Sequence, residues 1–165
     1  MKKLFIFVTS LIFMSVILIG CVQDNITQTD LENDIIQYYE SMDEVWELEQ
    51  EVKSSFGYVA TFKAATLEDA ITKIDFEIKP LIGEWEEKAN SVHPNTNELI
   101  EVHDKYLVMS QRYTYMVDYF RTMLKYEDKE SGAAFSKELE EVLGLSEEYT
   151  DGLEYLVENV FPSED

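Results

Sequence analysis

The residues best suited to chemistry are few and lie far apart in the sequence. The chain has two histidines, His93 and His103, and one cysteine, Cys21. Nucleophilic catalysis needs a serine, cysteine or lysine with a base within reach, and no such motif surrounds either histidine. Di-iron helical bundles use Glu-x-x-His pairs, but Asn90 and Ile100 stand three residues before the two histidines. We therefore expect no catalytic residue, no metal ligand, no cofactor and no enzymatic activity.

Glu49 and His103 are polar residues that fall on or beside predicted apolar stripes. In the first predicted helix, apolar residues recur every three or four positions around a gap at Glu49. A buried functional carboxylate is one interpretation. We favour a register that drifts towards Leu48 and leaves Glu49 at the rim, because glutamate is rarely buried without a partner. For His103 we favour a boundary histidine hydrogen-bonded to a neighbour over a metal ligand.

A column of tyrosine and methionine residues marks the third predicted helix. Heptads counted from Leu99 place Tyr106, Met109 and Tyr113 on one face, with His103 at its edge. Methionine adapts to varied ligands, and tyrosine combines apolar area with a hydroxyl group. This face therefore suits a small-molecule or metal carrier that uses the bundle interior. We favour the simpler interpretation that these residues form the core, because an amphipathic helix must bury its apolar face.

Four amphipathic segments position these residues. Their apolar side chains recur at the three- and four-residue spacing of helices that pack lengthwise, and no alternating run indicates a strand. The capping box Thr29-Asp30-Leu31-Glu32 marks the first helix start. Short loops between long helices favour antiparallel neighbours, so the predicted fold is all-α, an antiparallel up-down bundle. The helices are expected at about residues 30–56, 67–91, 97–126 and 131–161.

Two residues could interrupt these helices. Gly57 either ends the first helix or lies within it, because one glycine costs only about 1 kcal/mol. Pro80 removes a backbone hydrogen bond from the second helix. The apolar spacing nevertheless continues through Ile78, Leu81 and Trp85. We therefore expect Pro80 to kink the helix rather than break it.

The N-terminus has the build of a secretory signal, with two lysines, an uncharged apolar run and a small residue before Cys21. Its end, Leu18-Ile19-Gly20-Cys21, resembles the lipobox of bacterial lipoproteins. This resemblance implies that the signal is cleaved and that lipidated Cys21 becomes the first residue. The alternative is an uncleaved membrane helix, since the 20 residues 4–23 are uncharged. In both cases the basic start places the domain outside the cytoplasm.

These observations predict four regions and a location. They are a signal peptide (1–20), a lipidated cysteine with its tether (21–29), a helical bundle (30–161) and an acidic tail (162–165). The protein is expected at the cell membrane, anchored through lipid on Cys21. A diacylglyceryl group suffices for this, because two acyl chains give stable anchoring.

The charge of the chain limits its partners. Removal of Lys2 and Lys3 with the signal lowers the formal net charge from −21 to −23, with 34 acidic residues against 11 basic ones. Nucleic acid is excluded as a partner, because its binding depends on lysine and arginine. Runs such as Glu138, Glu140 and Glu141 are typical of solvated helix faces. A field of this size also attracts cationic partners. The sequence thus predicts a non-enzymatic protein that binds an envelope protein or a cationic ligand.

Overall fold

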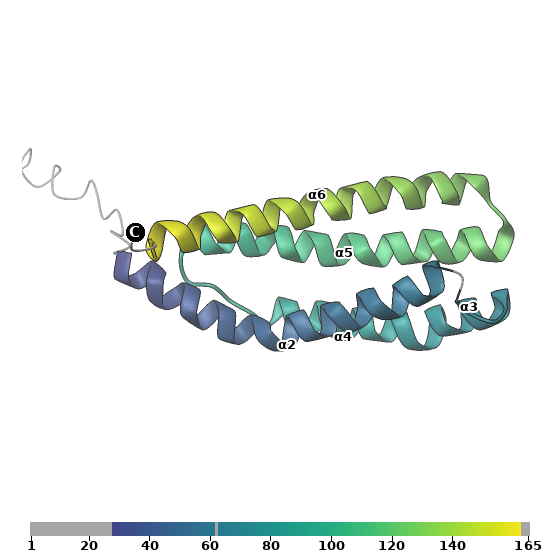
Figure 1. Ribbon diagram of the computed structural model, residues 1–165, viewed down its shortest axis with the longest axis horizontal. Helices are drawn as coiled ribbons and strands as arrows, with labels where there is room; N and C mark the ends of the chain where they lie inside the picture. Colours follow the sequence, from purple (N-terminus) through teal and green to yellow (C-terminus); the bar gives the residue numbers. More distant parts are fainter. Residues whose placement is uncertain (1–27, 62, 163–165) are drawn as a thin grey trace, which may run out of the picture.

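The computed structural model describes residues 28–61 and 63–162, and these residues form a bundle of long helices (Figure 1). Three helical segments, α3, the π-helix η1 and α4, follow one another without a break, so the chain builds four rods. No strand occurs in the described part of the chain, which confirms the all-α prediction. The elements are α2 (Gln28–Ala60), α3 (Leu67–Lys73), η1 (Ile74–Ile78), α4 (Lys79–Asn90), α5 (Asn97–Tyr126) and α6 (Lys129–Val160).

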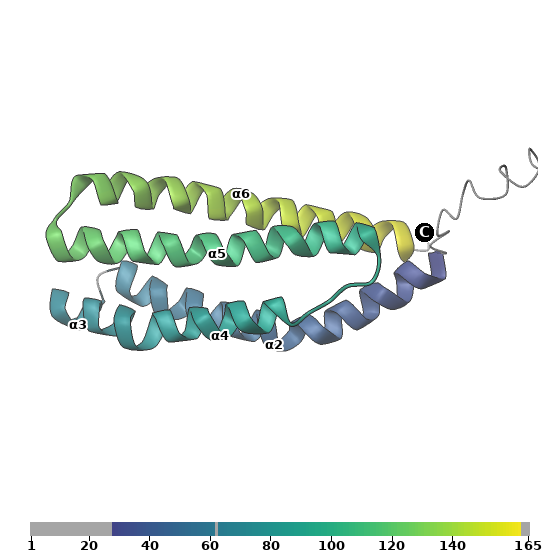
Figure 2. The same cartoon turned by 180° about the vertical axis from the view of Figure 1, so that it is seen from behind.

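The rods alternate in direction, as the up-down prediction requires. The hairpin of α5 and α6 lies over a second layer made of α2 and the rod from α3 to α4 (Figures 1 and 2). The first turn of α2 and the last turn of α6 lie at one end of the bundle. The α5–α6 connection and α3 lie at the other end. The two ends of the described chain are therefore close together.

The bounds of α2 show whether the helix passes Gly57 and correct the residue at which it was expected to begin. The helix passes through Gly57 and ends at Ala60, so the glycine lies inside it. At the other end α2 already includes Gln28 and Thr29, which the sequence assigned to the tether. Thr29 is thus inside the helix rather than at its cap. A shift of one or two residues is usual at helix ends, where the backbone has few intrahelical partners.

The second rod continues across Pro80, as expected, but contains a π-helical segment just before it. Its buried residues Ala70, Ile74, Ile78 and Ile82 follow at intervals of four. In an α-helix of 3.6 residues per turn, each such step rotates the face by about 40°. The wider π segment offsets this rotation, because its hydrogen bonds span five residues. Leu81, which the sequence placed on the stripe, is therefore only partly buried.

The connection before α5 is held by a residue of α2. Thr96 stands at the N-cap of α5, but its side chain does not cap the helix, and its hydroxyl donates to Asp34 at 2.7 Å. The carboxylate of Asp34 also accepts the backbone N–H groups of Asn95 and Thr96 at 2.9 and 2.8 Å. Burial raises the pKa of Asp34, but the bonds from Thr96 and Asn95 outweigh it and hold the pKa below its usual value. Asp34 thus fixes the loop to the first rod.

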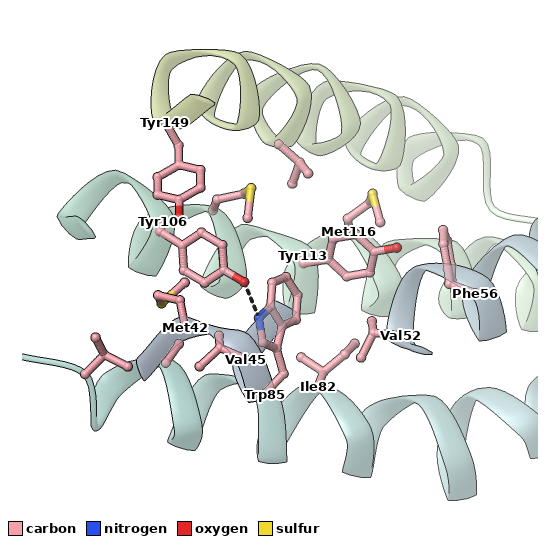
Figure 3. Close-up of a cluster of buried hydrophobic side chains, with 14 of the residues drawn as sticks. Met42, Val45, Val52, Phe56, Ile82, Trp85, Tyr106, Tyr113, Met116 and Tyr149 are labelled. Carbon is pink, nitrogen blue, oxygen red and sulfur yellow. Dashed lines mark hydrogen bonds between the residues drawn. The ribbon is translucent and has the colours of Figure 1, made fainter. Parts of the chain in front are cut away.

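The core runs along the axis between the two layers. Its central part is drawn in Figure 3, where side chains from α2, α4, α5 and α6 meet. Aromatic rings pack edge to face, including Phe56 against Phe120 and Trp85 against Tyr113. Such edge-to-face pairs stabilise a core beyond the area that they bury. The core face of α5 is the one predicted from its heptads.

Candidate functional site: a buried polar network and an acidic half

Glu49 lies inside the bundle, and the sequence interpretation that placed it at the rim is wrong. Only 7% of Glu49 is exposed, while Leu48 is the partly buried neighbour. The carboxylate accepts the Tyr106 hydroxyl at 2.7 Å and forms an ion pair with Lys53. The same hydroxyl accepts the indole N–H of Trp85 at 2.9 Å (Figure 3). These partners satisfy the carboxylate, which makes its burial possible.

His103 is also buried, with 3% exposed, and both ring nitrogens have partners. Nε2 lies 3.2 Å from the carbonyl oxygen of Ala89, and Nδ1 lies 3.0 Å from the Tyr38 hydroxyl. Because a carbonyl only accepts, Nε2 carries the proton. Burial lowers the pKa of His103, which favours the neutral ring. Nδ1 then accepts from Tyr38. The expectation of a histidine bonded to a neighbour is confirmed, although the residue is deeper than a boundary position.

The tyrosine side chains bring these two sets of hydrogen bonds into contact through their rings. The Tyr38 and Tyr149 hydroxyl oxygens are 3.3 Å apart, and the rings of Tyr106 and Tyr149 are 4.9 Å apart. Burial raises the pKa of Tyr149 to about 12, and it raises the pKa of Tyr38 above that of Tyr149. These tyrosines therefore stay protonated at neutral pH and act as hydrogen-bond donors. All four rods contribute to this network, because Trp85 and Ala89 belong to α4.

The residues proposed to line a carrier site pack as core. Tyr106, Met109, Tyr113 and His103 are all buried. Among the described residues, every buried side-chain nitrogen or oxygen atom has a hydrogen-bond partner. The described part of the chain also contains no group of three or more His, Cys, Asp or Glu residues placed to hold a metal ion. His93, the other histidine, is exposed.

The acidic residues are distributed unevenly along the bundle. We divide it at the level of Trp85 and Tyr106 into a terminal half, which holds both ends of the described chain, and a distal half. The terminal half (28–48, 86–108 and 145–162) has 17 acidic and 2 basic residues, a net charge of −15. The distal half (49–85 and 109–144) has 14 acidic and 9 basic residues, a net charge of −5.

Ion pairs follow the same division. The two basic residues of the terminal half, Lys88 and Lys105, are paired with Glu44 and Glu148. In the distal half, Arg121 binds Asp75 through two nitrogens, at 2.5 and 2.6 Å. The hydrogen bond from Arg121 is the main cause that lowers the pKa of Asp75. The excess negative charge therefore belongs to the terminal half.

One acidic cluster differs from its predicted form. Glu140 and Glu141 are exposed, as expected for a solvated face, but Glu138 is buried and accepts Arg112 at 3.1 and 3.3 Å. Arg112 lies on α5, 26 residues away, so the sequence pattern gave no sign of this pair. The only indication in the sequence that Glu138 is buried was its position next to Leu139, which belongs to the apolar stripe of this helix.

Cys21 and the lipobox lie outside the described residues, so lipidation stays a prediction. Among the helices of the described ranges, none has the length and apolar character needed to cross a membrane. Comparison with known proteins identifies no relative: no family model, curated protein or solved structure matches this chain.

Proposed function

We propose that this protein is a lipid-anchored, extracytoplasmic and non-enzymatic bundle that binds an envelope protein or a cationic ligand through its acidic surface. The observation that carries the proposal is the net charge of −15 in the terminal half. Exposed acids occur there on α2, α4, α5 and α6, among them Glu40, Glu87, Glu101 and Asp151. The field thus surrounds this half of the rod rather than one lateral face, and it draws cations from all sides.

The position of the terminal half supports an encounter at the membrane surface. Cys21 precedes Gln28 by seven residues. Even a fully extended chain of this length spans only about 25 Å. Lipid on Cys21 therefore keeps the terminal half close to the bilayer. A cationic segment of another envelope protein meets the strongest field at that height.

A synthetic oligolysine peptide provides a defined probe for this proposal. Surface plasmon resonance with the full chain in detergent micelles should show binding that weakens steeply with salt, because exposed charges are screened over about 8 Å at physiological ionic strength. Neutralising Glu147, Asp151 and Glu158 should slow association more than it speeds dissociation. The matched control neutralises Glu130, Glu140 and Glu141, which removes equal charge from the distal half and should have a smaller effect.

The outcome also separates this function from the carrier alternative. An apolar site near Met109 would give affinities that barely respond to salt, and Met109→Ala would change the dissociation rate. Pull-down from envelope extracts at low and high salt then extends the test to natural partners. Kinetics that stay flat in salt, or equal effects of the two charge variants, would remove the basis of the proposal.

A further inference from the structure

A groove with both polar and apolar lining lies at the distal end of the bundle, between the last turns of α2 and the rod that begins with α3. Its volume is about 590 Å³. The elements that line it, the end of α2 and α3, lie at the opposite end of the bundle from the two ends of the described chain (Figure 1). The lining residues come from α2, the following loop, α3 and η1. They are Ser54, Ser55, Tyr58, Ala64, Ala65, Asp69, Thr72, Lys73 and Glu77.

The groove combines an aromatic surface with polar groups. The side chain of Tyr58 is 44% exposed, and the Lys73 ammonium lies 5.8 Å from its ring centre. Lys73 also forms an ion pair with Glu77. Hydroxyl groups of Ser54, Ser55 and Thr72 line the same groove. The groove therefore offers a ligand one aromatic surface and several hydroxyl groups.

The charge of the groove is close to balanced. Its one basic residue, Lys73, stands against Asp69 and Glu77. Asp69 is engaged in the cap of α3, where its backbone N–H donates to the Thr66 hydroxyl oxygen at 3.0 Å and its carboxylate accepts that hydroxyl at 2.7 Å. The groove therefore lacks the strong field of the terminal half, and it suits an uncharged polar ligand better than a cation.

The backbone beside the groove is unusual. Glu77 belongs to the π-helical segment η1, and Lys73 immediately precedes it. Segments of this kind are rare and are frequently found at functional sites.

We propose that this groove binds a short, uncharged saccharide. A sugar ring has one face of C–H groups, which packs on an aromatic ring such as Tyr58. Its rim of hydroxyls both donates and accepts hydrogen bonds, as do Ser54, Ser55 and Thr72. Glu77 adds a carboxylate acceptor, and the Lys73 ammonium adds a donor. This proposal goes beyond the binding of cationic partners and does not depend on it.

Saturation-transfer difference NMR on the full chain in detergent micelles tests the proposal with two probes, maltotriose and the trimer of N-acetylglucosamine. At least one should receive magnetisation on its ring protons, with an affinity that does not change between low and high salt. Tyr58→Ala should weaken binding about tenfold, which corresponds to loss of one aromatic contact. Tyr58→Phe should retain binding.

Tyr155→Ala is the matched control, because Tyr155 is 67% exposed and lies on α6 in the terminal half. It should leave sugar binding unchanged. Since Tyr58 is also well exposed, its variants should keep the thermal unfolding midpoint of the parent protein. Three results would each overturn the proposal: no transfer to either sugar, binding that survives Tyr58→Ala, or binding that salt abolishes. None of them bears on oligolysine binding by the terminal half.

Discussion

Glu49 and His103 place polar chemistry in the middle of an otherwise apolar core. Their partners come from other parts of the chain: Tyr106 is 57 residues from Glu49, and Tyr38 is 65 residues from His103. A sequence shows that a polar residue falls on an apolar stripe, but not which group will face it. This is why the burial of Glu49 was not predicted. The buried bonds make the arrangement of the rods specific, because each group needs its own partner.

Replacing Glu49 tests how much this network contributes. Glu49→Ala leaves the Tyr106 hydroxyl without its acceptor, which should cost about 1–3 kcal/mol of unfolding free energy. Glu47→Ala is the matched control, since Glu47 is exposed two positions earlier, on the opposite side of the helix. Urea denaturation of both variants provides the measurement. Equal midpoints would show that the network does not stabilise the fold.

His103 should make stability depend on pH. Its pKa in the folded protein is below the ordinary value of 6.5, because burial disfavours the imidazolium ion. Between these two pKa values the unfolded chain binds more protons than the folded one. Stability from this group is therefore complete above pH 6.5 and declines as the pH falls through that value towards the folded pKa.

The tyrosines packed against His103 do not titrate in this pH window. Tyr38, Tyr106 and Tyr149 have raised pKa values, and the carboxylate of Asp34 has a lowered one. Thermal unfolding measured from pH 7.5 to 5 should show a falling midpoint. In His103→Gln the slope between pH 6.5 and 5 should become shallower. An identical slope in the variant would assign it to other groups.

At the scale of the elements, the sequence predicted most of the fold. The four rods, their order and the core face of α5 follow from apolar spacing and from turn residues such as Asp128, which caps α6 through the N–H of Ser131. The π segment was not predicted, because Ile71, Ile74, Ile78, Leu81 and Trp85 follow the three- and four-residue spacing of an α-helix. The structure instead buries Ala70, Ile74, Ile78 and Ile82, and these residues keep facing the core because the wider π turn offsets the rotation of each four-residue step.

The face assignment of α5 can be tested with a pair of substitutions. Met116 is buried on the core face, whereas Gln111 is exposed. Met116→Ala should lower the unfolding free energy by about 2–5 kcal/mol, because it leaves a cavity. Gln111→Ala should change it by less than about 0.5 kcal/mol. Calorimetric melting temperatures that shift equally would contradict this assignment.

The Asp34 bridge between α2 and the α4–α5 connection gives a further test. Asp34→Ala removes the acceptor of two backbone N–H groups, and hydrogen bonds to a charged group contribute about 1.5–3 kcal/mol. Asn33→Ala, at the exposed neighbouring position, is the control. Hydrogen exchange at the Asn95 and Thr96 amides should accelerate only in the Asp34 variant. Unchanged exchange would show that another contact holds the loop.

At the scale of the whole molecule, the anchor that we propose and the excess charge lie at the same end. Cys21→Ala should release the protein from the membrane or leave its signal unprocessed, because no other feature predicted from the sequence attaches it to the bilayer. Acyl chains contribute about 0.8 kcal/mol per buried methylene group. Membrane fractionation with mass spectrometry measures the outcome. A membrane-bound wild-type chain that retains Met1 and a free Cys21 thiol would support the uncleaved helix instead.

If the proposed lipid anchor holds the protein, the rod shape of the bundle sets how it stands on a membrane. The 33 residues of α2 correspond to a length of about 50 Å, several times the distance over which salt screens a charge. If the rod lay flat on an anionic bilayer, both negative halves would be repelled. When it stands upright on its tether, the distal half lies beyond the reach of the lipid field. In the anchored protein that we propose, electrostatic repulsion would therefore favour the upright orientation, and high salt would weaken this preference.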